Sequence, residues 1–70
     1  MRTLKFAENL KNAMQEAGIN QRQLAEKLGT TQQTISRWLS QRHEPDFETL
    51  LKICEFFDES PNSLLGYDNN

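Results

Sequence analysis

The tightest constraint on this 70-residue chain is the connection between two short predicted helices, residues 21–28 and residues 32–40. Apolar residues recur at three- and four-residue spacing in both segments, which is the period of an amphipathic helix. Gly29 tolerates the left-handed backbone that ends a helix, and Thr31 is a preferred N-cap residue. A link this short does not let two helices fold back side by side, so we expect them to cross at a steep angle.

Cap residues and apolar spacing predict three more helices around this pair. The first ends at Gly18, and its inner stripe is Phe6, Leu10, Ala13, Met14 and Ala17. Asp46 caps the fourth, whose inner residues are Phe47, Leu50, Leu51, Ile53, Cys54 and Phe57. Ser60 caps a short fifth helix with Pro61 at its first position, which returns Leu64 and Leu65 to the core. A capping box is expected for residues 21–28, formed by Asn20 and Gln23.

The whole pattern predicts an all-α fold, because no segment alternates polar and apolar residues as a strand does. We expect a compact five-helix domain over residues 1–66 and a short C-terminal tail over residues 67–70. A chain of this size has no room for a buried catalytic cleft. No apolar run reaches the ~18 residues of a membrane span. The single cysteine, Cys54, excludes an internal disulfide, and we expect a cytoplasmic protein with no membrane contact.

Charge is distributed unevenly along the chain. The net charge is −2, but residues 1–42 carry seven cations and three carboxylates, whereas residues 43–70 carry one cation and seven carboxylates. Such a division permits a cationic face and an anionic back on one small body, although mild segregation also arises by chance.

The helix predicted over residues 32–40 has an unusual outer side. On a helical wheel Ile35, Trp38 and Leu39 gather on one side. The opposite side carries Gln33, Ser36, Arg37 and Ser40, with Gln32 at its edge. No acidic residue occurs between Lys27 and Glu44. Glutamine can form two hydrogen bonds to adenine, and arginine can form two to guanine. Neutral surface residues are the alternative interpretation, but the absence of carboxylates beside a steeply crossed helix pair favours binding to base edges.

The segment from Asn20 to Trp38, NQRQLAEKLGTTQQTISRW, resembles the lambdoid phage repressor/Cro-type helix-turn-helix family, also called the Xre family. The likeness extends from Phe6 to Leu65. It implies a sequence-specific, double-stranded DNA-binding transcriptional regulator, most simply a repressor that acts as a homodimer on an operator. It implies no cofactor.

The resemblance also implies roles for individual residues. The base contacts would be Gln32, Gln33, Ser36 and Arg37. The phosphate contacts would be Gln21, Arg22, Gln23, Thr31, Ser40 and Arg42. The dimer seam of the family would fall on residues 58–63 and on Tyr67, with Phe56 or Phe57 as a further candidate. We find no catalytic set and no spacing typical of metal ligands, so an enzyme is not expected.

This chain departs from the family pattern at three positions. Many members have a glycine where this chain has Gln41, so Gln41 must take a left-handed conformation or the helix must end differently. Many also pair an arginine with a glutamate where this chain has Met14 and Leu39. We therefore predict an apolar contact between Met14 and Leu39, which avoids the desolvation cost of a buried ion pair.

Three conspicuous residues have simpler interpretations than a role in binding or chemistry. We expect Trp38 and Cys54 to be core residues and His43 to be a solvated loop residue, with a minor phosphate contact as its alternative.

Two alternative functions stay open. One functional alternative is an antitoxin-like autoregulator that also binds a toxin partner. The other is a helix-turn-helix protein-interaction module without DNA binding, which Arg37 and the glutamine pair disfavour.

Overall fold

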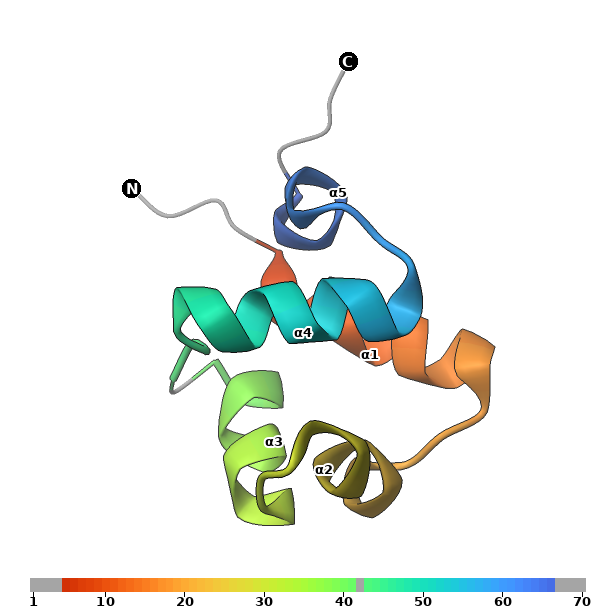
Figure 1. The fold of residues 1–70 in the computed structure, drawn as a ribbon, viewed down its shortest axis with the longest axis vertical. Helices are drawn as coiled ribbons and strands as arrows, with labels where there is room; N and C mark the ends of the chain where they lie inside the picture. The colour runs from red at the N-terminus through yellow and green to blue at the C-terminus, as the bar shows by residue number, and fades with distance from the viewer. Residues whose placement is uncertain (1–4, 42, 67–70) are drawn as a thin grey trace.

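The computed structural model describes residues 5–41 and 43–66, so Arg42, Tyr67 and the predicted tail lie outside the described residues. The helices are α1 (Phe6–Ala17), α2 (Gln21–Leu28), α3 (Gln32–Leu39), α4 (Phe47–Phe57) and α5 (Pro61–Leu65). In Figure 1, α2 and α3 lie below α4, α1 passes behind α4, and α5 lies above it. The described residues form no strand, which confirms the all-α, five-helix prediction. Within them, no helix combines the length and apolar character that crossing a membrane requires.

The helix boundaries follow the predicted caps. The side chain of Asn20 accepts a hydrogen bond from the Gln23 backbone N–H at 2.8 Å, and the Gln23 side chain accepts one from the Asn20 N–H at 2.9 Å. This reciprocal pair is the predicted capping box. The side chains of three other N-cap residues each accept a hydrogen bond from the third residue of their helix: Thr31, Asp46 and Ser60. Because these bonds satisfy otherwise unpaired N–H groups, they fix where each short helix begins.

One apolar cluster contains the inward faces of all five helices. Its fully buried side chains are Leu10, Leu24, Ile35, Ile53 and Leu64. Cys54 is buried among them with a free thiol, as predicted. Burial, and then the nearby Glu59 carboxylate, raises the pKa of this thiol. Cys54 therefore behaves as a packing residue rather than a nucleophile.

Three predicted core residues are exposed instead: Ala17, Phe47 and Leu51. Ala17 keeps the phase of the buried stripe, but it is the last residue of α1, where that helix runs past α4 (Figure 1). Phe47 is likewise the first residue of α4, at the opposite rim. Leu51 lies one position around the helix from Leu50, which takes the inward place. Periodicity gives the phase of a helix, but it does not show how far the neighbouring helices extend along it.

A polar contact that the sequence did not predict joins the two ends of the domain. The Asn9 side-chain amide donates hydrogen bonds to the backbone carbonyls of Ser63 at 3.2 Å and Leu64 at 3.0 Å. The Lys5 backbone N–H donates to the Leu65 carbonyl at 3.2 Å. These bonds pair carbonyl groups of α5, a helix too short to be stable alone.

Candidate nucleic-acid interface

The α3 helix is held with its polar side outward. Ile35 and Trp38 are buried, and the Trp38 ring meets the Phe6 ring of α1 at a centroid distance of 6.4 Å. The predicted base-contact residues are all exposed on the other side: Gln32, Gln33, Ser36 and Arg37. The predicted division of this helix into an apolar and a polar side is therefore confirmed, and Trp38 is a core residue.

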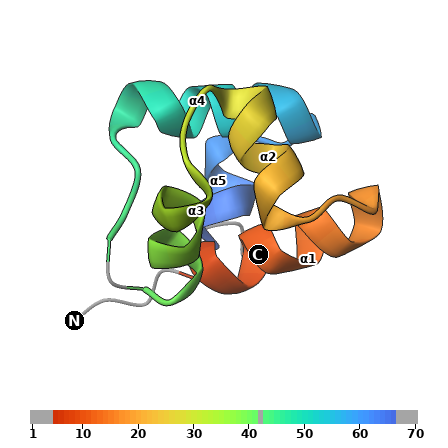
Figure 2. The ribbon, with the colours of Figure 1, turned by 90° about the horizontal axis from the view of Figure 1, so that it is seen from below.

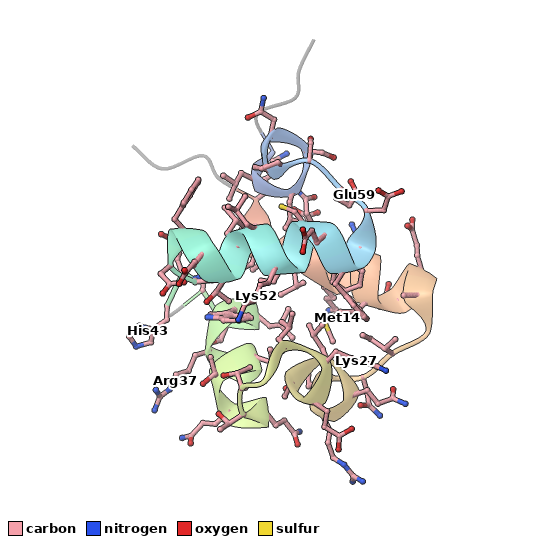
Figure 3. All side chains as sticks on the ribbon, in the orientation of Figure 1. Met14, Lys27, Arg37, His43, Lys52 and Glu59 are labelled. Atoms are coloured by element: carbon pink, nitrogen blue, oxygen red, sulfur yellow. The ribbon has the colours of Figure 1, made fainter. Side chains whose placement is uncertain are left out.

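The polar groups on this side are available to a ligand. Among residues 5–41 and 43–66, the side chains of Gln32, Gln33, Ser36 and Arg37 make no hydrogen bond or ion pair. Figure 3 shows the Arg37 side chain extending away from the body of the protein. The helix thus presents two amides, a hydroxyl and a guanidinium group, and it presents no carboxylate that would repel a polyanion.

The beginning of α2 lies beside the beginning of α3. A shallow hollow is lined by Asn20, Gln21, Arg22 and Gln32, so two predicted phosphate-contact residues adjoin a predicted base-contact residue. Asn20 caps the Gln23 N–H. The N–H groups of Gln21 and Arg22 have no carbonyl partner within α2, because no residue of this helix lies four positions before them. These N–H groups and the positive end of the helix dipole suit an anion such as a phosphate.

Three other predicted phosphate contacts already have local partners. The Gln23 side-chain oxygen belongs to the capping box, so only its amide NH₂ group is available. The Thr31 hydroxyl caps α3 and lies 3.0 Å from the Thr34 hydroxyl. The Ser40 hydroxyl donates to the Arg37 carbonyl at 3.1 Å. All three residues are exposed and adjoin the polar side of α3 or α2.

The α3 helix ends in the first of the two predicted ways, with a left-handed residue at position 41. Gln41 takes a left-handed conformation with φ of 66°, where many members of the resembled family have a glycine. The chain then turns so that the His43 N–H donates to the Arg37 carbonyl at 3.4 Å. His43 is an exposed loop residue, as predicted.

Two lysines that the sequence did not single out also adjoin this surface. Lys11 of α1 lines a hollow of about 380 Å³ together with Gln21, Met14 and Leu39. Met14 belongs to the core cluster and Leu39 packs on it, while a direct contact between the two side chains stays a prediction. Lys52 of α4 lines another hollow of about 400 Å³ together with Arg37 and His43. No motif marks either lysine, because its position depends on how α1 and α4 pack beside the helix pair.

The chain belongs to the helix-turn-helix family, since a model of that family matches residues 10–64. Two relatives come from Bacillus subtilis (strain 168). The HTH-type transcriptional regulator ImmR is 35% identical over 65 residues, covering 93% of this chain and 51% of the relative. The uncharacterized HTH-type transcriptional regulator YqaE is 34% identical over 65 residues, covering 93% of this chain and 56% of that protein. This chain therefore spans about half the length of these relatives.

Solved structures show the same fold. A transcriptional regulator from Listeria innocua superposes with a TM-score of 0.88 at 31% identity, covering 100% of this chain and 64% of that one. The P22 c2 repressor, in a crystal structure with a synthetic operator, superposes with a TM-score of 0.83 at 28% identity, covering 90% of this chain and 96% of the repressor. The predicted repressor-like architecture is confirmed.

Proposed function

We propose that this chain is a sequence-specific, double-stranded DNA-binding transcriptional regulator that acts in the cytoplasm as a repressor, in the form of a homodimer on an operator. The observation that carries the proposal is the outer side of α3, where amide and guanidinium groups are exposed without internal partners and without a carboxylate. The likeness to a repressor crystallised with its operator supports it.

In this proposal α3 lies in the major groove. Gln32, Gln33, Ser36 and Arg37 read base edges, because glutamine matches adenine and arginine matches guanine with paired hydrogen bonds. Phosphates on either side are held by Gln21, Arg22, Gln23, Thr31, Ser40 and Arg42. Phosphate contacts fix the register of the helix in the groove, and base contacts select the sequence.

A dimer follows from the energetics of reading few base pairs. Each mismatched pair costs only about 1–3 kcal/mol, so one small domain discriminates weakly against the many competing sites of a genome. Two half-sites about one helical turn apart combine the discrimination of two copies. An occupied operator then blocks polymerase. Because the chain carries a net charge of −2, its binding to random sequence should be modest and sensitive to salt.

Selection of binding sites from a random pool of duplexes at physiological salt tests the proposal. We expect an enriched inverted repeat, with half-sites that contain adenine and guanine at the positions read by the glutamines and Arg37. The matched control is Arg37→Ala, which should relax the choice of one base pair in each half-site. If the wild-type chain enriches no sequence, the proposed function is wrong.

A further inference from the structure

A hollow of about 380 Å³ opens where α1, the beginning of α2 and the last residue of α3 meet, and we call it the α1–α2 hollow. Figure 2 shows α2 beginning beside α1 and running toward α4. Three apolar side chains line the hollow: Met14 is 6% exposed, and Ile19 and Leu39 pack on the core cluster. The rest of its lining is polar and comprises Lys11, Gln15, Asn20 and Gln21. The hollow thus combines an apolar floor with polar groups around it.

The α1–α2 hollow contains no carboxylate. It shares Asn20 and Gln21 with the shallow hollow that also contains Arg22 and Gln32, and that hollow contains no carboxylate either. Three other hollows in the described part of the chain contain acidic residues, which are Glu8, Glu16, Glu44, Asp46 and Glu59. A polyanion is therefore repelled less where α1 meets the beginning of α2 than at these other hollows.

Two groups around the α1–α2 hollow suit anions. One is the Lys11 ammonium group on α1. The other is the beginning of α2, where the N–H groups of Gln21 and Arg22 have no carbonyl partner within the helix. In a nucleic-acid strand each sugar is flanked by two phosphates. A strand that uses both anion-binding groups therefore brings one sugar over the apolar floor.

We propose that the α1–α2 hollow receives the C2′ side of one deoxyribose of the operator, while Lys11 and the beginning of α2 hold the phosphates on either side. The inference rests on the proposed function, and it specifies which sugar the site accepts. The C2′ atom of deoxyribose carries only hydrogen, so it matches the floor formed by Met14, Ile19 and Leu39. Burial of these apolar groups against each other is favourable.

A ribose would bring a hydroxyl group to a floor that has no partner for it. The side chains of Met14, Ile19 and Leu39 offer no strong hydrogen-bonding group. The carbonyl groups at the end of α1 are already paired, since Met14 accepts from the Ile19 N–H at 3.1 Å and Gln15 accepts from the Gly18 N–H at 3.2 Å. A 2′-hydroxyl buried here without a bond would cost binding free energy. The α1–α2 hollow therefore selects deoxyribose against ribose.

The apolar floor is a property of this chain rather than of the whole family. Many members of the resembled family have an arginine and a glutamate at the positions of Met14 and Leu39. Such charged groups would offer partners to a hydroxyl group, whereas a thioether and an aliphatic side chain do not.

Single sugar substitutions in the operator that the wild-type chain selects test this inference. Each position of one half-site, on both strands, carries in turn a ribonucleotide or a 2′-fluoro ribonucleotide, and anisotropy titrations give the two affinities. Fluorine favours the same sugar pucker as the hydroxyl but does not donate a hydrogen bond, so the ratio of the affinities isolates the effect of the hydroxyl. We expect a ratio of about ten in favour of fluorine at one position and a ratio close to unity elsewhere.

The variant Leu39→Gln connects the sensitive position with the α1–α2 hollow. Its amide puts a hydrogen-bonding group on the floor, so the ratio at that position should fall close to unity. The matched control is Leu51→Gln, at a leucine of α4 that is 40% exposed and does not line the hollow. This control should keep the wild-type ratio.

Two results would overturn the inference while the proposed function stands. One is a ratio close to unity at every position of the wild-type complex, and the other is a Leu39→Gln variant that keeps the wild-type ratio. The scan with the wild-type chain decides the matter even if circular dichroism shows that Leu39→Gln does not fold. If the wild-type chain does not bind the unmodified duplex, the proposed function is wrong, and this inference is wrong with it.

Discussion

The ring of Phe6 meets the ring of Trp38 edge-on, with centroids 6.4 Å apart and planes inclined at 69°. This contact joins the first residue of α1 to the last turn of α3, and both side chains are buried. It thus helps set the direction of α3 relative to the rest of the core. The outward polar side of α3 depends on an apolar contact on its inner side.

The Phe6–Trp38 contact should show as a coupling energy in a double-mutant cycle. We expect Phe6→Leu and Trp38→Leu each to lower the free energy of unfolding, and the pair to lower it by less than the sum. The difference should be about 0.5–1.5 kcal/mol, the range for edge-to-face aromatic pairs. Urea denaturation of the four proteins measures it. Strict additivity would show that the rings contribute only through burial.

Replacing Gln41 by glycine should stabilise the protein. Gln41 has a φ of 66°, a conformation that strains a residue with a Cβ atom and suits glycine. We expect Gln41→Gly to raise the free energy of unfolding by about 0.5–1 kcal/mol, and the melting temperature by several degrees. The control is Gly29→Ala, where φ is 73° and an added Cβ meets no atom within 4 Å, so strain alone should destabilise it. A lower melting temperature for Gln41→Gly would contradict this explanation.

The Asp46 cap should give stability a dependence on acid pH. Hydrogen bonds from the side chain and then the backbone N–H of Thr49 lower the pKa of the Asp46 carboxyl below its ordinary value of 3.8, Lys52 adds to this, and desolvation opposes it. Because the folded state has the lower pKa, the contribution is complete well above pH 3.8 and is lost as the pH falls through the folded-state pKa.

Asp46→Asn provides the comparison, because asparagine keeps the cap acceptor but does not titrate. We expect thermal melts to show the largest advantage of the wild type over this variant near neutral pH, and a smaller one at pH values below 3.8. An advantage that stays constant with pH would show that the carboxylate charge adds nothing to the cap.

Lys11 should contribute to DNA binding without affecting sequence choice. It lines one hollow with Gln21, at the proposed phosphate site of α2. We expect Lys11→Met to weaken binding equally for selected and unrelated duplexes, and to reduce the slope of log affinity against log salt by about 1. The comparison is Lys5→Met, which removes the same charge from a lysine that lines a hollow with Gln41 and His43 instead of with Gln21. Equal effects of the two substitutions would indicate a general charge effect instead.

Local chemistry made the fold predictable from the sequence. Side chains such as Asn20 and Asp46 accept hydrogen bonds within three residues of themselves, so a short sequence segment contains both partners of each cap. Long-range packing was harder to predict. Phe47 lies outside the core because it begins α4 at the rim, and Leu51 lies outside it because Leu50 takes the inward place. The Asn9 contact joins residues more than fifty positions apart.

The candidate site was likewise predictable where it depends on one short segment, and not where it depends on packing between helices. The outward side of α3 follows from helical period and from the buried Ile35 and Trp38, which the sequence contains in one segment. The positions of Lys11 and Lys52 do not, because each lysine reaches the surface on a different helix that packs against the pair. The sequence predicts that the Thr31 hydroxyl caps α3, but it does not show that the Ser40 hydroxyl donates to the Arg37 carbonyl.

The central claim is that the outer side of α3 reads duplex DNA, and a titration of the selected operator with the double variant Gln33→Ala and Arg37→Ala tests it most directly. Each lost base contact should cost about 1–3 kcal/mol, so affinity should fall at least tenfold while the circular dichroism melt stays that of the wild type. Operator affinity equal to that of the wild-type protein would contradict the assignment of this helix side as the reading surface.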